Sequence, residues 1–342
     1  MAAAPRTQDH RCVRCVEAPS RVRRRARLAA ASRVVSDPLV AAPVRLTPAT
    51  RTGTVRTPRS PLLDPVSPDA WCLHSAAVTV TPVYSIAKIF TAAAALRCLD
   101  PEREIGAVAP VPARLAGLRV GDLLTHRSGL GDYGAWPEYR RAVAERGDAW
   151  PEEVILERVE LARPGVFRYS NPGYLLVRRA LEEQHGDRFF PVLRRLVLDP
   201  LELPAHPFAS RADWAHCTVE IPAGVRAYDP RWVYPGTFCA DVTDTAAALA
   251  RLLSGTLGAE LPTAMCRTHP VDAPGHPLSD PGYGAGLMTS GNPPAIVGHG
   301  GGGPGFTLFA AARVDGSAAH GTVEARECDD APLIRRCLAA LR

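Results

Sequence analysis

Lys88 is the only lysine in this chain of 342 residues, which holds 40 lysines and arginines together, and it follows Ser85 by three positions. The guanidinium of arginine keeps its charge in proteins, whereas a desolvated lysine amine can lose its proton and act as a base. The choice of lysine at this one position therefore indicates a chemical role. The pair suits a serine nucleophile that a lysine activates. S-x-x-K is a weak motif by itself, and an ordinary surface lysine is the alternative.

The residues that follow Ser85 are expected to form a buried helix that positions this pair. The segment 85–96 is rich in strong helix formers and lacks Gly and Pro, while Pro82 ends the extended run before it. We therefore expect Ser85 in the first helical turn and Lys88 one turn later on the same face. Backbone N–H groups at a helix start favour an oxyanion near Ser85 and help the amine to release its proton.

Three later segments carry motifs in a fixed order. They are Leu123–Leu130 with the sequence LLTHRSGL, Tyr169-Ser170-Asn171, and His299-Gly300-Gly301. Together with Ser85 and Lys88 they resemble the serine β-lactamase and penicillin-binding-protein superfamily, whose relatives carry LLTHTSGL, Y-x-N and K-T-G or H-x-G. The resemblance is to the branch of class C β-lactamases, D-alanyl-D-alanine carboxypeptidases and related esterases.

The resemblance implies roles for residues in each motif. Ser85 is the nucleophile, and Tyr169 is the general base together with Lys88, or the shuttle that passes the serine proton onward. Asn171 orients the substrate amide or Lys88. The glycine-rich edge with Gly301 forms a wall of the cleft, and the N–H of Gly302 joins the N–H of Ser85 in an oxyanion hole. Without the other motifs, Tyr169 and Asn171 could be a half-buried tyrosine and a helix cap.

His299 stands where many relatives have a lysine. The charge of a histidine near neutral pH depends on its surroundings, so the recognition of a substrate carboxylate by this residue is in doubt. This favours neutral esters or amides over β-lactams and peptides. The glycine-rich run 298–305 could be a flexible loop, but the apolar segments on both sides favour the edge of a strand.

The resemblance implies an α+β fold of two lobes, in which helices flank an antiparallel β-sheet and an all-helical lobe is inserted. The pattern of apolar residues, caps and breakers agrees with this order of elements. We expect helices at 151–159, 173–181, 188–198, 243–253 and 333–341, the second opened by Asn171 as N-cap, and strands at 283–289 and 306–313. The loops 132–140 and 232–238 are candidates for substrate specificity.

The beginning of the chain departs from the relatives, which place a helix and two long strands before the nucleophile. Residues 1–60 hold 13 arginines against three acidic residues, without periodicity, and we expect a disordered basic segment over 1–70. Only the segment 75–80 could supply a strand. Either the sequence does not start as a complete homologue does, or the sheet lacks N-terminal strands. The hydrolase domain is expected over 71–342, with its helical lobe at roughly 100–275.

Composition limits the partners. The Arg23-Arg24-Arg25 run leaves export open, but no convincing apolar stretch follows it, and an arginine-rich arm without a reader module predicts no nucleic-acid partner. The nine cysteines are scattered; apart from Cys12 and Cys15, half of a zinc knuckle, they favour buried thiols and a cytoplasmic location. No histidine cluster predicts a metal, and we expect no cofactor and no membrane-spanning segment.

The sequence therefore predicts a metal-free serine hydrolase that acts through an acyl-enzyme on an ester, amide or β-lactam bond of a small molecule or peptide. The alternative is an inactive relative that binds cell-wall fragments or a protein partner in the same cleft. The missing strands favour this alternative, whereas the complete set of motifs favours the enzyme.

Overall fold

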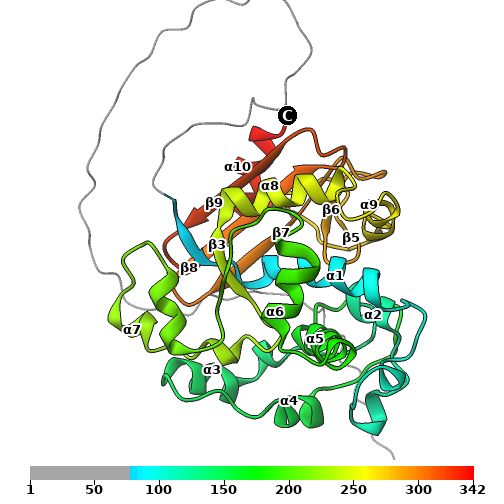
Figure 1. Cartoon of the computed structure of the whole chain (residues 1–342), viewed down its shortest axis with the longest axis vertical. Coiled ribbons are helices and arrows are strands. Elements are labelled where there is room, and N and C mark those ends of the chain that lie inside the picture. Colours follow the sequence, from blue (N-terminus) through cyan, green and yellow to red (C-terminus); the bar gives the residue numbers. More distant parts are fainter. Residues whose placement is uncertain (1–77) are drawn as a thin grey trace, which may run out of the picture. The chain divides into compact units, whose positions relative to one another are not determined.

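The computed structural model describes residues 78–342. The segment 1–70 expected to be disordered, and the domain boundary placed after it, lie outside the described residues. The predicted class is confirmed, because the structure combines an antiparallel sheet with helices on its two faces and a mainly helical segment inserted in the sequence (Figure 1).

The main sheet has six antiparallel strands in sequence order, so each strand pairs with the next along the chain. The strands are β4 His269–Pro270, β5 Gly282–Tyr283, β6 Met288–Ser290, β7 Ile296–Gly303, β8 Phe306–Arg313 and β9 Ala319–Glu324. Strand β8, which is mostly apolar, pairs with β7 on one side and β9 on the other, and these are the longest pairings of the sheet. Its side chains alternate between the two faces of the sheet, as the pleat requires.

Two helices pack against β8, one on each face of the sheet. Leu308 and Ala310 belong to the large core that also includes helix α8, Val242–Leu253, while Phe309 packs with Leu333 and Ile334 of helix α10, Ala331–Ala340. Figure 1 shows α8 crossing the face of β8 and β9. Because nearly all side chains of β8 are buried, apolar groups lie on both faces of the sheet, and one helix covers each face.

A second, small sheet leads the chain into the nucleophile segment. Strand β1, Val80–Pro82, pairs with β3, Phe238–Asp241, which also pairs with β2, His206–Pro207. The strand expected within 75–80 therefore begins at Val80, at the edge of the described residues, and it belongs to this small sheet instead of the six-stranded one. Directly after β1 come the 3₁₀ turn Tyr84–Ile86 and helix α1, Ala87–Cys98.

Helices and 3₁₀ turns are the main regular elements of the chain between α1 and the main sheet. They are α2 Val120–Leu124, α3 Pro137–Ala144, α4 Glu152–Arg158, α5 Asn171–His185, α6 Phe189–Leu193, α7 Ala223–Arg226 and α9 Glu260–Met265, with 3₁₀ turns at Ile105–Ala107, Ala113–Leu115, Tyr133–Ala135, Arg211–His216 and Pro230–Trp232. Helix α6 continues as a π-helical turn, Arg194–Leu198, so the helix expected at 188–198 changes its winding midway. Helix α5 buries one apolar face against α1 and α2.

The prediction of one continuous strand at 283–289 is wrong, because its middle residues form a turn. Strands β5 and β6 cover only its ends, and the chain turns between them with Gly286 at a φ of +70°. A β-carbon at Gly286 would lie 2.5 Å from the Lys88 carbonyl oxygen. The turn therefore exists because the chain must approach α1 closely, which the apolar pattern does not reveal.

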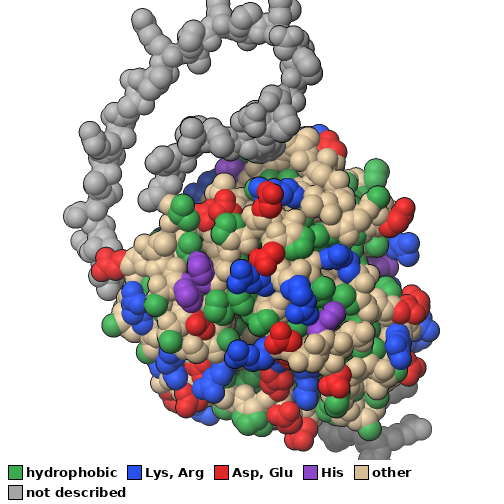
Figure 2. All heavy atoms as spheres, in the orientation of Figure 1, with side chains coloured by type: hydrophobic (Ala, Val, Ile, Leu, Met, Phe, Trp, Pro, Cys, Tyr) green, Lys and Arg blue, Asp and Glu red, His purple; other side chains and the backbone are tan. Residues whose placement is uncertain are grey.

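The surface of the described part carries mixed charge. Arginines and acidic side chains are interspersed over the face shown in Figure 2. The cysteines in residues 78–342 are all free thiols, with Cys239 and Cys337 buried, while Cys12, Cys15 and Cys72 lie outside the described residues. Within 78–342, the helices are too short or too polar to cross a membrane.

Candidate active site

Ser85 lies in a constrained turn, not in the α-helix itself. The residue before it, Tyr84, has a φ of +47°, which breaks the α-helical path, so Ser85 falls in the 3₁₀ turn and α1 starts at Ala87. A left-handed backbone at a bulky residue is strained and persists only where its surroundings hold it. Here the Tyr84 hydroxyl donates to the Pro304 carbonyl at 2.7 Å, and Thr237 donates to the Tyr84 carbonyl at 3.1 Å.

The predicted catalytic side chains meet at the Ser85 hydroxyl. Lys88 Nζ lies 3.0 Å from Ser85 Oγ, and the Tyr169 hydroxyl donates to the same oxygen at 2.9 Å. Lys88 Nζ also donates to Asn171 Oδ1 at 2.8 Å. Of the two roles left open for Asn171, its contact is with Lys88. Residues that are 84 positions apart in the sequence are thus within hydrogen-bonding distance.

Burial shifts the pKa values of the two candidate bases, Lys88 and Tyr169, in opposite directions. Lys88 is 2% exposed, and desolvation lowers the pKa of its amine to about 7. Burial raises the pKa of the Tyr169 phenol well above its usual value. Near neutral pH the Lys88 amine is therefore available as a base, whereas Tyr169 keeps its proton and can donate it.

The start of helix α5 positions Tyr169 next to Ser85 and Asn171 next to Lys88. Ser170, not Asn171, is the N-cap: its hydroxyl accepts from the Gly173 N–H at 3.1 Å and donates to the Gly131 carbonyl at 2.9 Å. The expected cap at Asn171 is thus wrong by one residue. Because Ser170 performs the capping, the Asn171 side chain is free to reach Lys88.

His299 is buried beside the site, with both ring nitrogens occupied. Its Nδ1 lies 2.6 Å from the Gly300 carbonyl and must carry the proton, so Nε2 accepts from the Tyr283 hydroxyl at 3.0 Å. Burial and the nearby Lys88 lower the pKa of His299 to about 3. A neutral imidazole without a free donor cannot replace the lysine of related proteins in binding a carboxylate.

The contact between Tyr283 and His299 can be tested by removing one hydroxyl. In Tyr283→Phe the buried Nε2 of His299 loses its donor, and we expect the free energy of unfolding to fall by about 1–3 kcal/mol in urea titrations. Tyr139→Phe is the control, because that hydroxyl makes only a long contact of 3.4 Å with the Trp232 carbonyl. Equal stability of the two variants would contradict this assignment of the histidine.

The glycine-rich run forms most of strand β7, which packs against the 3₁₀ turn that carries Ser85. A β-carbon at Gly301 would lie 2.4 Å from the Val83 carbonyl oxygen, and one at Gly303 would lie 2.5 Å from the ring of Tyr84. At Gly302 a β-carbon would meet nothing within 4 Å. The expected strand edge is present, and its glycines permit the approach of β7 to Ser85. The N–H of Gly302 stays a predicted oxyanion donor.

Two residues of the site were not predicted individually. Asp132 accepts hydrogen bonds beside Asn171, and the His126 ring packs against the rings of Tyr169 and Tyr283 at centroid distances of 4.4 and 4.8 Å. His126 Nδ1 also accepts from the Ser170 N–H at 3.1 Å. His126 lies in the LLTHRSGL motif, and Asp132 lies just beyond it, so this motif was the available signal.

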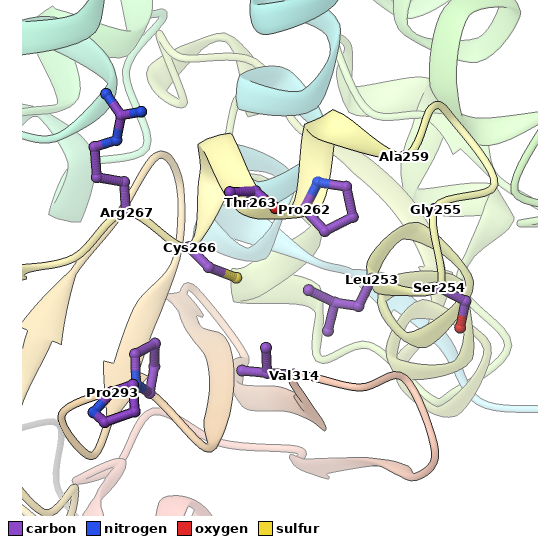
Figure 3. A pocket seen from close by; sticks show the side chains of 11 residues that line it. Leu253, Ser254, Gly255, Ala259, Pro262, Thr263, Cys266, Arg267, Pro293 and Val314 are labelled. Atoms are coloured by element: carbon purple, nitrogen blue, oxygen red, sulfur yellow. The ribbon is translucent and has the colours of Figure 1, made fainter.

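A groove of about 710 Å³ lies elsewhere on the described part. It is lined by residues near the end of α8, by α9, by Val314 and by two prolines; the side chains of Leu253, Cys266 and Val314 point toward one another in it (Figure 3). None of the predicted catalytic residues lines it. Within 78–342, no group of three or more His, Cys, Asp or Glu side chains has a geometry that could hold a metal ion.

Comparisons with solved structures reveal the same fold in bacterial and archaeal proteins. The D-stereospecific amidohydrolase from Streptomyces sp. has a TM-score of 0.61 at 20% identity, with 74% of this chain and 84% of that chain covered. The D-amino acid amidase from Ochrobactrum anthropi SV3 gives 0.62 at 19% identity, covering 80% and 86%. The octameric penicillin-binding protein homologue from Pyrococcus abyssi gives 0.61 at 21% identity, covering 77% and 66%.

The sequence itself has no significant match among curated proteins. A family model does match it: the model described as Beta-lactamase aligns with residues 73–319, which include Ser85, Lys88, Tyr169 and the glycine-rich strand. This range covers most of the chain and every motif that the geometry brings together. The chain therefore belongs to the beta-lactamase family.

Proposed function

We propose that the protein is a serine hydrolase that forms an acyl-enzyme on Ser85. The observation that carries the proposal is the convergence on one hydroxyl oxygen of Lys88 Nζ at 3.0 Å and the Tyr169 hydroxyl at 2.9 Å. A nucleophile within reach of a base that is itself oriented by a third group, here Asn171, is the arrangement that activates a serine.

The protonation states support a specific order of proton transfers. Above a pH of about 7 the Lys88 amine is uncharged, so Ser85 can donate its proton to Nζ while Oγ attacks the substrate carbonyl. Tyr169, which keeps its proton, donates it to the leaving group and is reprotonated by the Lys88 ammonium. Water then releases the acyl group by the same path in reverse. The N–H groups of Ser85 and Gly302 would hold the oxyanion.

We infer that the substrate is a neutral ester or amide, with no carboxylate at the position that faces β7. His299 is uncharged at neutral pH, and its two nitrogens are engaged by Gly300 and Tyr283. Amides have additional support, because two structural neighbours are a D-stereospecific amidohydrolase and a D-amino acid amidase.

Covalent labelling tests the proposal directly. The full chain is incubated with a fluorophosphonate, and its intact mass is compared with that of Ser85→Ala treated in the same way. We expect one adduct on the natural sequence and none on the variant, because the probe reacts only with an activated serine. Release of product from amide and ester panels then defines the substrate.

The outcome also distinguishes the alternative function. No adduct on a natural chain that unfolds cooperatively would contradict the hydrolase and favour a binding protein that uses the same cleft. An adduct that persists in Ser85→Ala would place the nucleophile elsewhere. Ser128, which is buried in the LLTHRSGL motif, serves as the matched control through Ser128→Ala, since it contacts none of the catalytic side chains in a hydrogen bond.

A further inference from the structure

The side chain of Asp132 holds the backbone of Asn171. Its Oδ2 accepts from the Asn171 N–H at 2.7 Å, and its Oδ1 accepts from the Gly134 N–H at 2.7 Å. Because Asn171 Oδ1 accepts from Lys88 at 2.8 Å, Asn171 connects the carboxylate to the amine, with its backbone N–H toward Asp132 and its side-chain oxygen toward Lys88.

The charges around Lys88 make this connection informative. The groups that face the amine are the carboxylate of Asp132, the imidazoles of His126 and His299, and the phenols of Tyr169 and Tyr174. Burial keeps both imidazoles and both phenols uncharged near neutral pH, by lowering the pKa of the former and raising the pKa of the latter. Burial raises the pKa of the Asp132 carboxyl, while the N–H groups of Asn171 and Gly134 and the charge of Lys88 oppose this rise. In its ionised form Asp132 is the one anion among these groups, and it raises the pKa of Lys88 that burial lowers.

We propose that Asp132 is a positioning residue of the site, which fixes Asn171 in place and sets the balance between the charged and uncharged forms of Lys88. The proposal rests on the hydrolase function proposed above, for which Lys88 must alternate between these two forms. Without the anion, the amine would lose its proton too readily to return it to Tyr169. Without the two accepted N–H bonds, Asn171 would no longer orient the amine.

The single lysine permits a direct experiment. The full chain is produced with lysine labelled at ¹³Cε, so that the folded protein has one lysine signal, and the shift of this signal is followed against pH. We expect a midpoint at about 7 in the natural sequence. In Asp132→Asn the midpoint should fall by roughly 0.5–1 pH unit, less than the ~1–3 units of a direct charge pair, because Asn171 lies between the groups.

Asp148→Asn is the matched control, because Asp148 is an exposed carboxylate that pairs with Arg211 at 2.7 Å. Its midpoint should equal that of the natural sequence. An unchanged or higher midpoint in folded Asp132→Asn would overturn the charge-setting role. If the variant fails to fold, its signal titrates near the ordinary lysine value of 10.5. In that case Asp132→Glu, which keeps the anion, serves as the second variant: its midpoint should stay near that of the natural sequence, and a fall by about 1 pH unit with the charge retained would overturn the proposal.

The labelling rate with a fluorophosphonate supplies the second measurement. If the natural sequence is never labelled, the proposed hydrolase fails while the titration of Lys88 still tests Asp132. If the natural sequence is labelled, the rate should fall at low pH as Lys88 becomes protonated. We expect this fall to move to lower pH in Asp132→Asn together with the ¹³C midpoint, and a labelling profile that stays in place would contradict the role.

Discussion

Replacing Lys88 by arginine should slow the acylation of Ser85 by about 10²–10⁴-fold, the range expected when a general base is lost. Arginine keeps the positive charge but cannot release its proton in a protein, so the variant retains the electrostatics and lacks the base. The measurement is the rate of fluorophosphonate labelling, followed by intact mass at several pH values.

The pKa of Lys88 determines whether the labelling rate of the natural sequence rises or falls with pH. The pKa of Lys88 is about 7 because the amine is buried, so the uncharged base is present above this pH and is lost as the pH falls. The rate should therefore rise through pH 7 and decline by about tenfold per unit below it. Lys88→Arg should be slow at every pH, with no such rise.

Two further variants separate the loss of the base from damage to the fold. Arginine is larger than lysine and position 88 is fully packed, so Lys88→Met, which keeps the length without charge, must be equally slow. Arg97→Lys makes the reverse change at an exposed position of the same helix and should leave the rate unchanged. A labelling rate near that of the natural sequence in Lys88→Arg would exclude Lys88 as the base.

The pairing of Ser85 with Lys88 was predictable because its signal is local. A run of strong helix formers after Ser85 and a single lysine among many arginines need no knowledge of distant contacts. The same holds for strand β8, because a short apolar run predicts the strand at 306–313 that the structure contains. The meeting of Tyr169 with Ser85 came from the resemblance and not from the physics of the sequence, since no local pattern joins residues 84 positions apart.

What escaped prediction depends on contacts between distant segments. In the sequence Asp132 is the first residue of the loop 132–140, and only the fold shows that it accepts the Asn171 N–H. The neutral state of His299 depends on its burial and on the Tyr283 hydroxyl. The shift of Ser85 into a 3₁₀ turn follows from the left-handed Tyr84, whose bulky side chain gives no hint of such a backbone.

Gly301→Ala should be among the most damaging single-methyl changes in the chain. The new β-carbon would lie 2.4 Å from the Val83 carbonyl oxygen and 3.3 Å from the Ile86 side chain. Either β7 or the 3₁₀ turn that carries Ser85 must therefore move. Overpacking of this kind costs about 1–3 kcal/mol. We expect the melting temperature to fall by about 2–4 °C for each kcal/mol of lost stability. A displacement of β7 by ~1 Å should also slow the labelling of Ser85 by about 10²-fold.

Gly302→Ala is the control that makes this result specific, because the neighbouring position adds the same methyl group on the same strand. A β-carbon there meets nothing within 4 Å, and the backbone N–H expected in the oxyanion hole remains. Its melting temperature should match the natural sequence, and the fluorophosphonate should still label Ser85. If Gly301→Ala were as stable and as reactive as Gly302→Ala, the close approach of β7 to the nucleophile turn would not govern the site, and the glycine-rich run would have to be explained by access of the substrate to its exposed side.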